Sequence, residues 1–392
     1  MAHYDYLIIG GGMTADAAVH GIREADTAGS VGLICAEPHP PYNRPPLSKA
    51  LWKGEPLESI WRKTADTGAT LHLGRRVTAI DVSGTRVTDD RGNEHTFGKL
   101  LLATGGAPRR LPLESSQIIY FRTYDDYRRL RALADHSLQF AVIGGGFIGS
   151  EIAAALRMQE REVVMLVPEQ GLGARVFPAD LSRFLVDYYR EKGVTLRTGE
   201  GMQELRPREG RVVVQTTTGA EFEADVVVAG LGIQPNVSLA EQAGLRLENG
   251  IVVDEFLRTS AAGIYAAGDV ANFFNPALAT RLRVEHEDNA NTMGRIAGLN
   301  MAGRPTPYHH LPFFYSDLFD LGYEAVGDTD ARYETVADWK EPFREGVVYY
   351  LKDGRVRGVL LWNTWGQVEH ARALIAEPGP FTAQALTGRL PV

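Results

Sequence analysis

An internal repeat constrains the fold of this chain more than any other feature of its sequence. The segment YLIIGGGMTADAAVHGIRE at 6–24 has the same pattern as FAVIGGGFIGSEIAAALRM at 140–158. Each consists of a short apolar run, three glycines, and small residues with helical periodicity. A further apolar run follows each copy, VGLIC at 31–35 and VVMLV at 163–167. Strands that alternate with helices predict parallel sheets, so the repeat predicts two similar α/β domains.

The glycine triplets predict two phosphate-binding turns. A strand, a glycine turn and a helix N-terminus let the backbone approach a pyrophosphate closely, and the helix dipole favours its charge. The pattern is met by Gly10, Gly12 and Ala15 in the first copy, and by Gly144, Gly146 and Gly149 in the second. Each copy also has an acid at the spacing expected for a ribose-binding carboxylate, Glu37 and Glu169. The alternative is a pair of glycine-rich turns that hold no ligand.

Two dinucleotide sites in one chain suggest a flavin and a nicotinamide cofactor. A second flavin motif is TSAAGIYAAGDVANFF, in which Gly268 and Asp269 end a strand and the aspartate can bind the ribityl chain. An ordinary strand-end turn is the alternative for this dipeptide taken alone. Glu169 favours NADH over NADPH, because a carboxylate accepts from a ribose 2′-hydroxyl and repels a 2′-phosphate. Arg175 is a complication, since a nearby arginine can pair with phosphate.

The composition excludes several classes of function. The chain has 41 basic and 49 acidic residues and a net charge of −8, which disfavours non-specific nucleic-acid binding. One cysteine permits neither an internal disulfide nor a cysteine-based metal cage, and we predict no metal site. No apolar run approaches the roughly 18 residues of a membrane-spanning helix. The N-terminus has no basic leader, so the sequence predicts a cytoplasmic protein.

A third domain is indicated after residue 308. Aromatic residues cluster in LPFFYSDLFDLGYEAVG, and EGVVYYLKDGRVRGVLLWN predicts a hairpin that turns at Asp353-Gly354. A helix is expected at about 367–376. The predicted domains are a discontinuous FAD-binding domain at 1–117 and 252–308, an NAD-binding domain at 118–251, and a C-terminal α+β domain at 309–392.

Several motifs together resemble a known family. YLIIGGG, PYNRPPLSKALW, LLLATGG, VIGGGFIGSE, AGLGIQPN and IYAAGDV are similar to those of the class I pyridine nucleotide-disulfide oxidoreductase fold, in its ferredoxin-reductase-like branch. VPEQG, RVEHEDNANTMGRIAGLNMAG, FYSDL, GYEAVG and VLLWN resemble the apoptosis-inducing factor group. The match runs from about residue 5 to 376. The chain departs at the redox cysteines, since Asn43 stands in the loop position and Cys35 lies in a strand. Cys35 is therefore interpreted as a small core residue.

The resemblance gives the stretch YNRPPLSK a role. Its prolines predict a helix start, with Arg44 at the loop edge and Lys49 about one turn into the helix. By resemblance, Arg44 supports the flavin diphosphate, and Lys49 lies beside the flavin ring, paired with Glu151. Taken alone, Lys49 would be read as a solvated lysine. Glu151 also has an alternative explanation. It is expected in the first turn of a helix, where the helix dipole favours an acid without any functional role.

Other predicted site residues also come from the resemblance. Phe147 is either a gate over the flavin or a packing residue. Glu285 and His286 would lie under the flavin, with His286 predicted as catalytic together with Lys49 and Glu151. Tyr315 stands where the group often has tryptophan. Glu324 matches a cofactor-contacting acid, whereas Gly366 departs from a polar residue of the group. The remaining predicted cofactor-binding residues are Val77, Arg122, Ile148 and Gly232.

The sequence thus predicts an FAD-dependent NADH oxidoreductase that passes electrons to ferredoxin, a quinone or oxygen. The alternative implied by the resemblance is a redox-responsive binding protein, in which a long-lived complex of reduced flavin and NAD⁺ alters homodimer formation. A dinucleotide-binding scaffold without activity is disfavoured, because both fingerprints and both ribose acids are intact.

Overall fold

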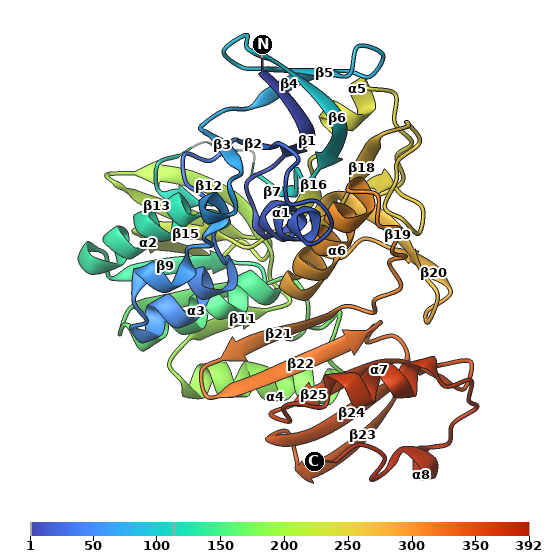
Figure 1. Ribbon diagram of the computed structural model, residues 1–392. Coiled ribbons are helices and arrows are strands. Elements are labelled where there is room, and N and C mark those ends of the chain that lie inside the picture. The colour runs from blue at the N-terminus through green and yellow to red at the C-terminus, as the bar shows by residue number, and fades with distance from the viewer. Residues whose placement is uncertain (1, 112, 114, 392) are drawn as a thin grey trace. The chain divides into compact units, whose positions relative to one another are not determined.

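A computed structural model describes residues 2–111, 113 and 115–391 (Figure 1). The chain forms two compact units. Unit 1 consists of 1–44, 57–107 and 234–312, and unit 2 consists of 45–56, 108–233 and 313–392. The boundaries of the three predicted domains stay a prediction.

The sheet of unit 1 has the parallel core that the first copy of the repeat predicts. Its strands are β1 (Ala2–Ile9), β2 (Val31–Cys35), β3 (Thr70–Leu73), β4 (Val77–Asp81), β5 (Arg86–Asp89), β6 (Glu94–Leu102) and β18 (Ile264–Ala266). They run in the order β3-β2-β1-β6-β5-β4, with β18 also paired to β6. β1, β2, β3, β6 and β18 pair in parallel, whereas β4 and β5 form an antiparallel extension. The apolar run of β2 is buried throughout, as expected for a central parallel strand.

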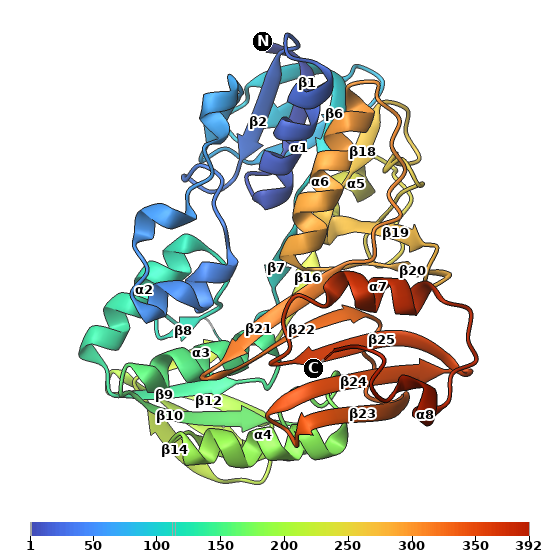
Figure 2. The ribbon, with the colours of Figure 1, turned by 60° about the horizontal axis from the view of Figure 1, so that its bottom comes forward.

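Two helices of unit 1 pack against each other through glycines. They are α1 (Met13–Ala25) and α6 (Glu287–Met301), which Figure 2 shows side by side. A Cβ on Gly298 would lie 2.1 Å from the carbonyl oxygen of Ala18, so only glycine permits this approach. Smaller elements of unit 1 are η3 (Leu57–Ile60), η4 (Thr64–Thr67), α5 (Ser238–Gln242), β17 (Ile251–Val252), η5 (Gly268–Val270), β19 (Ala271–Asn275) and β20 (Thr280–Leu282).

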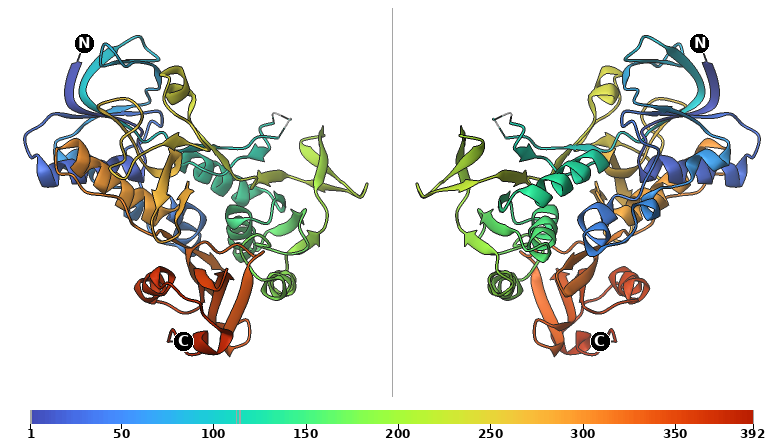
Figure 3. Two further views of the ribbon diagram at one scale, coloured as in Figure 1. Left: turned by 90° about the vertical axis from the view of Figure 1, so that its right-hand side faces the viewer. Right: turned by 90° about the vertical axis from the view of Figure 1, so that its left-hand side faces the viewer.

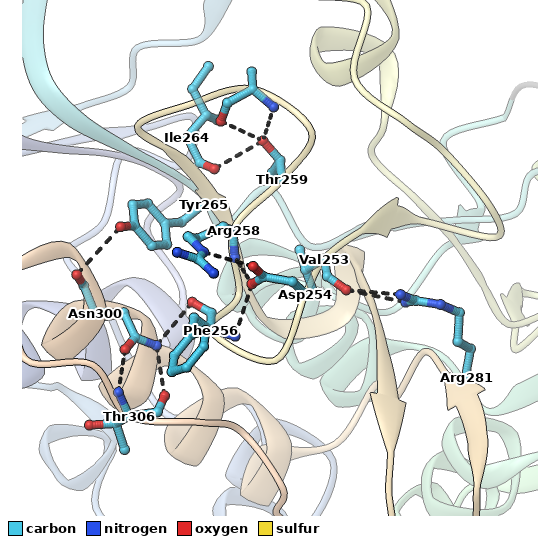
Figure 4. Close-up of polar contacts among 11 residues, drawn as sticks. Val253, Asp254, Phe256, Arg258, Thr259, Ile264, Tyr265, Arg281, Asn300 and Thr306 are labelled. Carbon is cyan, nitrogen blue, oxygen red and sulfur yellow. Dashed lines mark hydrogen bonds and ion pairs between the residues drawn. The ribbon is translucent and has the colours of Figure 1, made fainter.

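A hydrogen-bonded loop leads into β18 (Figure 4). The Asp254 carboxylate accepts from the backbone N–H groups of Phe256 and Arg258, and the Arg258 Nε donates to it at 2.7 Å. The Asn300 side chain, from α6, donates to the carbonyl oxygens of Phe256 and Thr306. These bonds hold the segment that precedes the predicted flavin motif at the end of β18.

A cluster of titratable groups lies within the sheet of unit 1. The Tyr4 hydroxyl is 2.8 Å from His72 Nε2, and the ring centroids of His72 and His95 are 4.8 Å apart. His95 is buried beside Asp89, which also pairs with Arg75 at 2.9 Å. Burial, followed by repulsion from His95 and Arg75, lowers the pKa of His72. Folded His72 therefore binds a proton less readily than an ordinary histidine.

Acidification should destabilise the protein through this cluster. An unfolded histidine binds a proton below about pH 6.5, while folded His72 binds one only at lower pH. The contribution of His72 to stability is thus present above pH 6.5 and declines as the pH falls toward its folded pKa. The loss is at most about 1 kcal/mol per pH unit, because solvent screens this half-buried side chain. The His72→Gln variant should show a flatter dependence of melting temperature on pH below 6.5, and an unchanged slope would contradict this account.

Unit 2 begins its parallel sheet with the second copy of the repeat. The sheet has the order β11-β10-β9-β15-β8. Its elements are β8 (Ile118–Ile119), α2 (Tyr124–His136), β9 (Gln139–Ile143), α3 (Phe147–Met158), β10 (Glu162–Val167), α4 (Ala179–Glu191), β11 (Thr195–Thr198) and β15 (Val226–Ala229). Thr123 begins α2 with a capping box to Asp126. An antiparallel sheet is inserted, with strands β12 (Met202–Arg208), β13 (Arg211–Thr216) and β14 (Glu221–Ala224) (Figure 3).

The C-terminal part of unit 2 is a five-stranded antiparallel sheet. Its order is β21-β22-β25-β24-β23, and α7 lies along β22 and β25 (Figure 2). The elements are β21 (Phe313–Leu318), β22 (Leu321–Gly327), β23 (Glu334–Glu341), β24 (Glu345–Lys352), β25 (Arg355–Trp362), α7 (Val368–Ala376) and α8 (Ala383–Leu386). The predicted hairpin at Asp353-Gly354 and the helix near 367–376 are confirmed. Two short strands, β7 (Gly106–Pro108) and β16 (Ile233–Pro235), lie where the chain passes between the units.

The segment after Arg44 differs from its prediction. The two prolines begin a 3-10 turn, η1 (Pro45–Ser48), and a second turn follows, η2 (Ala50–Lys53). Lys49 lies between them with φ −128° and ψ −94°, so it is not within a helix. The expected single helix is therefore wrong, because a non-helical residue interrupts it and turns the lysine side chain toward a buried acid.

Candidate functional site

The glycine turn of unit 1 has the shape of a phosphate cradle. Gly10 has φ +140°, and a Cβ there would lie 2.2 Å from the carbonyl oxygen of Ala103. Gly12 caps α1, and the nearest described atom to a Cβ at this position is Arg44 Nη2 at 3.9 Å. The first glycine thus allows a tight turn, and the second leaves its backbone accessible at a helix N-terminus. Ala15, the third position of the pattern, is fully buried.

The predicted ribose acid and diphosphate arginine of unit 1 are in contact. Arg44 Nη2 is 2.5 Å from Glu37 Oε1, and the Tyr42 hydroxyl donates to Glu37 Oε2 at 2.5 Å. Burial alone would lower the pKa of Arg44, but Tyr42, Glu37 and Asp269 outweigh it and raise that pKa. Arg44 is therefore a permanent cation beside Gly12. Tyr42 was missed in the sequence, because no local pattern distinguishes it from a packing tyrosine.

The other predicted residues of unit 1 lie on several elements. Gly268 has φ +77° and abuts Thr14 of α1, where a Cβ would lie 2.3 Å from the hydroxyl. Glu285 pairs with Arg283 at 2.6 Å, and His286 is the N-cap of α6. Val77 is buried at the start of β4. Their roles toward a cofactor stay predictions.

The glycine turn of unit 2 repeats the same geometry. Gly144 has φ +104°, and a Cβ there would lie 2.4 Å from the carbonyl oxygen of Gly230. A Cβ on Gly149 would lie 2.0 Å from the Gly144 carbonyl oxygen. Gly146 caps α3, and no described atom lies within 4 Å of where its Cβ would be. This is the arrangement that a pyrophosphate requires, with tight packing at the first and third glycines and open backbone at the second.

The predicted ribose acid of unit 2 follows the strand next along the chain. Glu169 follows the end of β10, and its carboxylate is 3.3 Å from Arg175 Nη2. The Glu169 side chain is 37% exposed and that of Arg175 is 88% exposed, so both are accessible to solvent. Gly232 lies in the loop after β15 with φ +77°.

A buried ion pair joins Lys49 to Glu151. Lys49 Nζ is 2.7 Å from Glu151 Oε1, and the two side chains are 11% and 3% exposed. Two serine hydroxyls also donate to this carboxylate, Ser48 to Oε2 and Ser316 to Oε1, each at 2.6 Å. Glu151 is the fifth residue of α3, so its predicted place in the first turn is wrong. The helix dipole therefore does not explain why an acid occupies this position. Its three donors, Lys49, Ser48 and Ser316, explain it instead.

The surroundings of Glu151 are aromatic. Burial, followed by repulsion from the Glu151 carboxylate, raises the pKa values of Tyr189 and Tyr323 well above the ordinary value. Lys49 Nζ lies 5.4 Å from the ring centroid of Tyr315, a cation–π arrangement. Both tyrosines close to Glu151 therefore remain neutral. Among the residues that the structure describes, Lys49 is the cation that pairs with this acid.

Three further predicted residues of unit 2 lie on α3 and on the β21–β22 hairpin. Phe147 begins α3, and its ring centroid is 5.0 Å from that of Phe314. Glu324 lies opposite Tyr315 in the β21–β22 hairpin, and burial raises its pKa. One oxygen of Glu324 is buried without a hydrogen-bond partner among the described residues, as expected for an atom that contacts a ligand. Ile148 is exposed on α3.

Arg122 precedes α2, and its backbone N–H donates to Asp126. Cys35 is fully buried, and burial raises the pKa of its thiol to about 12, which confirms it as a core residue.

In the part of the chain that the structure describes, no three acids, histidines or cysteines gather as a metal would require. The helices of that part include none with the length and apolar character needed to cross a bilayer.

Comparison with known proteins assigns the family. Residues 4–294 match the model of the pyridine nucleotide-disulphide oxidoreductases. The chain belongs to this family. Residues 297–342 and 337–377 match the C-terminal domain of the mitochondrion-associated apoptosis-inducing factor. The resemblance stated from the motifs is thereby confirmed.

Three similar proteins place this oxidoreductase within the family. Apoptosis-inducing factor 1 of Dictyostelium discoideum is 33% identical over 95% of this chain and 78% of that protein. The ferredoxin reductase subunit of 5,5′-dehydrodivanillate O-demethylase of Sphingobium sp. is 34% identical, over 96% of this chain and 94% of the relative. The crystal structure of the covalent putidaredoxin reductase–putidaredoxin complex has a TM-score of 0.90 and 30% identity, over 97% and 94% of the two chains.

These findings confirm the predicted fold class, with two dinucleotide-binding domains and a C-terminal domain. This oxidoreductase is an NAD(P)H-dependent flavoprotein of the ferredoxin-reductase-like branch, and FAD is the flavin that the family uses. The two glycine cradles, each with open backbone at its second glycine, fit two dinucleotides.

Proposed function

We propose that this oxidoreductase uses NADH to reduce FAD and passes the electrons to a ferredoxin. The observation that carries the proposal is the pair of cradles, each followed by a carboxylate after the next strand, Glu37 in unit 1 and Glu169 in unit 2. The names of two relatives, a ferredoxin reductase subunit and a putidaredoxin reductase bound to its partner, support ferredoxin as the acceptor.

The residues of unit 1 would hold FAD. Gly12 and the N-terminus of α1 would bind its diphosphate together with Arg44, and Glu37 would bind the adenosine ribose. Asp269 would bind the ribityl chain. When bound, FAD accepts hydride from the nicotinamide and passes electrons on singly.

The residues of unit 2 would hold and orient NADH. Gly146 and the N-terminus of α3 would bind the pyrophosphate, and Glu169 would accept from the ribose 2′-hydroxyl. Lys49, held against Glu151 by a buried ion pair, would present a positive charge to the flavin ring. Phe147, Tyr315 and Glu324 would surround the nicotinamide.

Charge at Glu169 should set the choice of nicotinamide cofactor. The Glu169→Gln variant keeps the side-chain shape, removes the charge that repels a 2′-phosphate, and leaves Arg175 to pair with it. We expect kcat/KM for NADPH to rise about tenfold, which corresponds to about 1.4 kcal/mol, and that for NADH to fall severalfold. The control is Glu204→Gln, which removes the same charge from an exposed position on β12. If both variants keep the wild-type ratio of kcat/KM for NADPH to kcat/KM for NADH, Glu169 does not select the cofactor.

The acceptor is tested by reduction of a ferredoxin. NADH oxidation by the FAD-loaded protein is measured with a [2Fe–2S] ferredoxin coupled to cytochrome c, and separately with a quinone and with oxygen alone. Ferredoxin should accelerate turnover at least about tenfold over oxygen. Equal rates with oxygen and ferredoxin would contradict the proposed acceptor.

The second candidate is a redox-responsive binding protein of the apoptosis-inducing factor type. The match of residues 297–342 and 337–377 to the C-terminal domain of that factor favours it. Under this alternative, reduction by NADH would give a long-wavelength absorbance band that survives air for minutes, together with a shift to a homodimer in size-exclusion chromatography. Rapid reoxidation without a change in elution volume would exclude this alternative.

A further inference from the structure

A buried tyrosine lies between two oppositely charged residues of unit 1. Tyr42 is 1% exposed, and its hydroxyl donates to Glu37 Oε2 at 2.5 Å. The same hydroxyl accepts from Arg44 Nη1 at 2.9 Å, and the guanidinium carbon lies 5.0 Å from the ring centroid. The charges fix the direction of both hydrogen bonds, because a carboxylate only accepts and a guanidinium only donates.

This arrangement fixes the orientation of the Glu37 carboxylate. Arg44 Nη2 donates to Oε1 while Tyr42 donates to Oε2, so each oxygen has one donor among the described residues. A carboxylate can accept about four hydrogen bonds, which leaves one site on each oxygen. Two sites in a fixed plane suit the two adjacent hydroxyls of a ribose.

Tyr42 is linked to the helix that begins at the cradle through the segment at Trp61 and Arg62. Its ring meets Trp61 edge-on at 5.9 Å, and the two residues form a β-bridge. The next residue, Arg62, donates from Nε to Asp16 of α1 at 2.7 Å. Asp16 lies in the first turn of α1, whose N-cap is Gly12. The tyrosine is thus tied to the element that would bind the diphosphate.

We propose that Tyr42 is a positioning residue that couples Glu37 to Arg44, so that ribose and diphosphate are recognised as one unit. The inference rests on the proposed FAD site of unit 1. It follows that loss of the Tyr42 hydroxyl weakens binding of the adenosine diphosphate half of FAD through its effect on Glu37 and Arg44. It also follows that Glu37 and Tyr42 do not contribute independently.

The test uses the full chain stripped of flavin. FAD affinity is measured by the quenching of flavin fluorescence, and ADP affinity by competition. Tyr42→Phe keeps the buried ring, and we expect it to weaken FAD and ADP by a similar factor of about ten, as for loss of a hydrogen bond to a charged group. The matched control is Tyr6→Phe, which removes a tyrosine–carboxylate bond to Asp26 elsewhere in unit 1 and should leave both affinities unchanged.

Two further variants distinguish coupling from a merely structural effect. Arg44→Lys keeps the charge, but a lysine cannot bond to Tyr42 and Glu37 at once. This variant should weaken ADP binding at least as much as Tyr42→Phe does. In the double variant Glu37→Gln/Tyr42→Phe, the loss should be smaller than the product of the two single losses. The inference would be overturned if Tyr42→Phe bound FAD and ADP with wild-type affinity. It would also be overturned if the loss of affinity in the double variant equalled the product of the two single losses. Either result would leave the proposed FAD site intact. A wild-type protein that binds neither FAD nor ADP would overturn the FAD site as well.

Discussion

The Gly146→Ala variant is expected to fold normally and to lose NADH binding. A methyl group at Gly146 meets no described atom within 4 Å, and the residue has φ −82°, which alanine adopts without strain. The methyl group would instead occupy the space in front of the α3 N-terminus, where the pyrophosphate must approach the backbone.

The effect should be large because several hydrogen bonds to a charged group are lost together. Each contributes about 1.5–3 kcal/mol, so we expect the Kd for NADH to rise about 100-fold or more. Binding is measured by the anaerobic rate of flavin reduction against NADH concentration, with melting temperature as the measure of folding. FAD content should stay at the wild-type level.

Two other glycines serve as controls. Gly12→Ala should instead lower the FAD content of a folded protein, because its methyl group blocks the cradle of unit 1. Gly149→Ala should lower the melting temperature, since its Cβ would lie 2.0 Å from the Gly144 carbonyl oxygen. A Gly146→Ala variant that is reduced by NADH as the wild type is would refute the cradle in unit 2.

Among the substitutions considered, removal of Glu151 should lower the free energy of unfolding the most. The Glu151→Leu variant leaves the ammonium of Lys49 buried without its carboxylate and removes the acceptor of Ser48 and Ser316. Breaking a buried pair from one side costs about 3–5 kcal/mol, because the remaining charge has lost its partner. Urea unfolding followed by tryptophan fluorescence should show this loss, and NADH should reduce the flavin more slowly.

The double variant Lys49→Met/Glu151→Leu separates the pair from its environment. It should recover much of the stability, because apolar residues of similar size replace both charges, but not the rate of flavin reduction. The control Glu377→Leu breaks an exposed pair with Arg389 and should cost less than about 1 kcal/mol. Full stability in the single variant would contradict a buried charge pair, and a wild-type reduction rate in the double variant would exclude a role for Lys49.

Periodicity and glycine spacing were sufficient to predict the two βα repeats. The alternation of apolar runs with helical patterns depends on local sequence, and the positions of Gly10 and Gly144 require conformations that other residues adopt poorly. The hairpin at Asp353-Gly354 was predicted for the same reason, since its turn chemistry is local.

Side-chain contacts between distant segments could not be predicted in this way. Ser48 and Ser316 meet on one carboxylate although 268 residues separate them, and no local pattern records that contact. The prolines before Lys49 correctly indicated a helical start, but tertiary contacts with Glu151 overrode the helix at the lysine. Tyr42 was missed likewise, because its role depends on the charges on both sides of it.

We propose that NADH, bound at the cradle of Gly146, reduces FAD, bound at the cradle of Gly12. The most direct test is an anaerobic titration of the FAD-loaded protein with NADH, and separately with NADPH, followed across the visible spectrum. We predict that about one equivalent of NADH bleaches the flavin absorbance and that NADPH requires a large excess. Flavin absorbance that persists with both nucleotides, in protein that melts as a folded chain, would contradict the account.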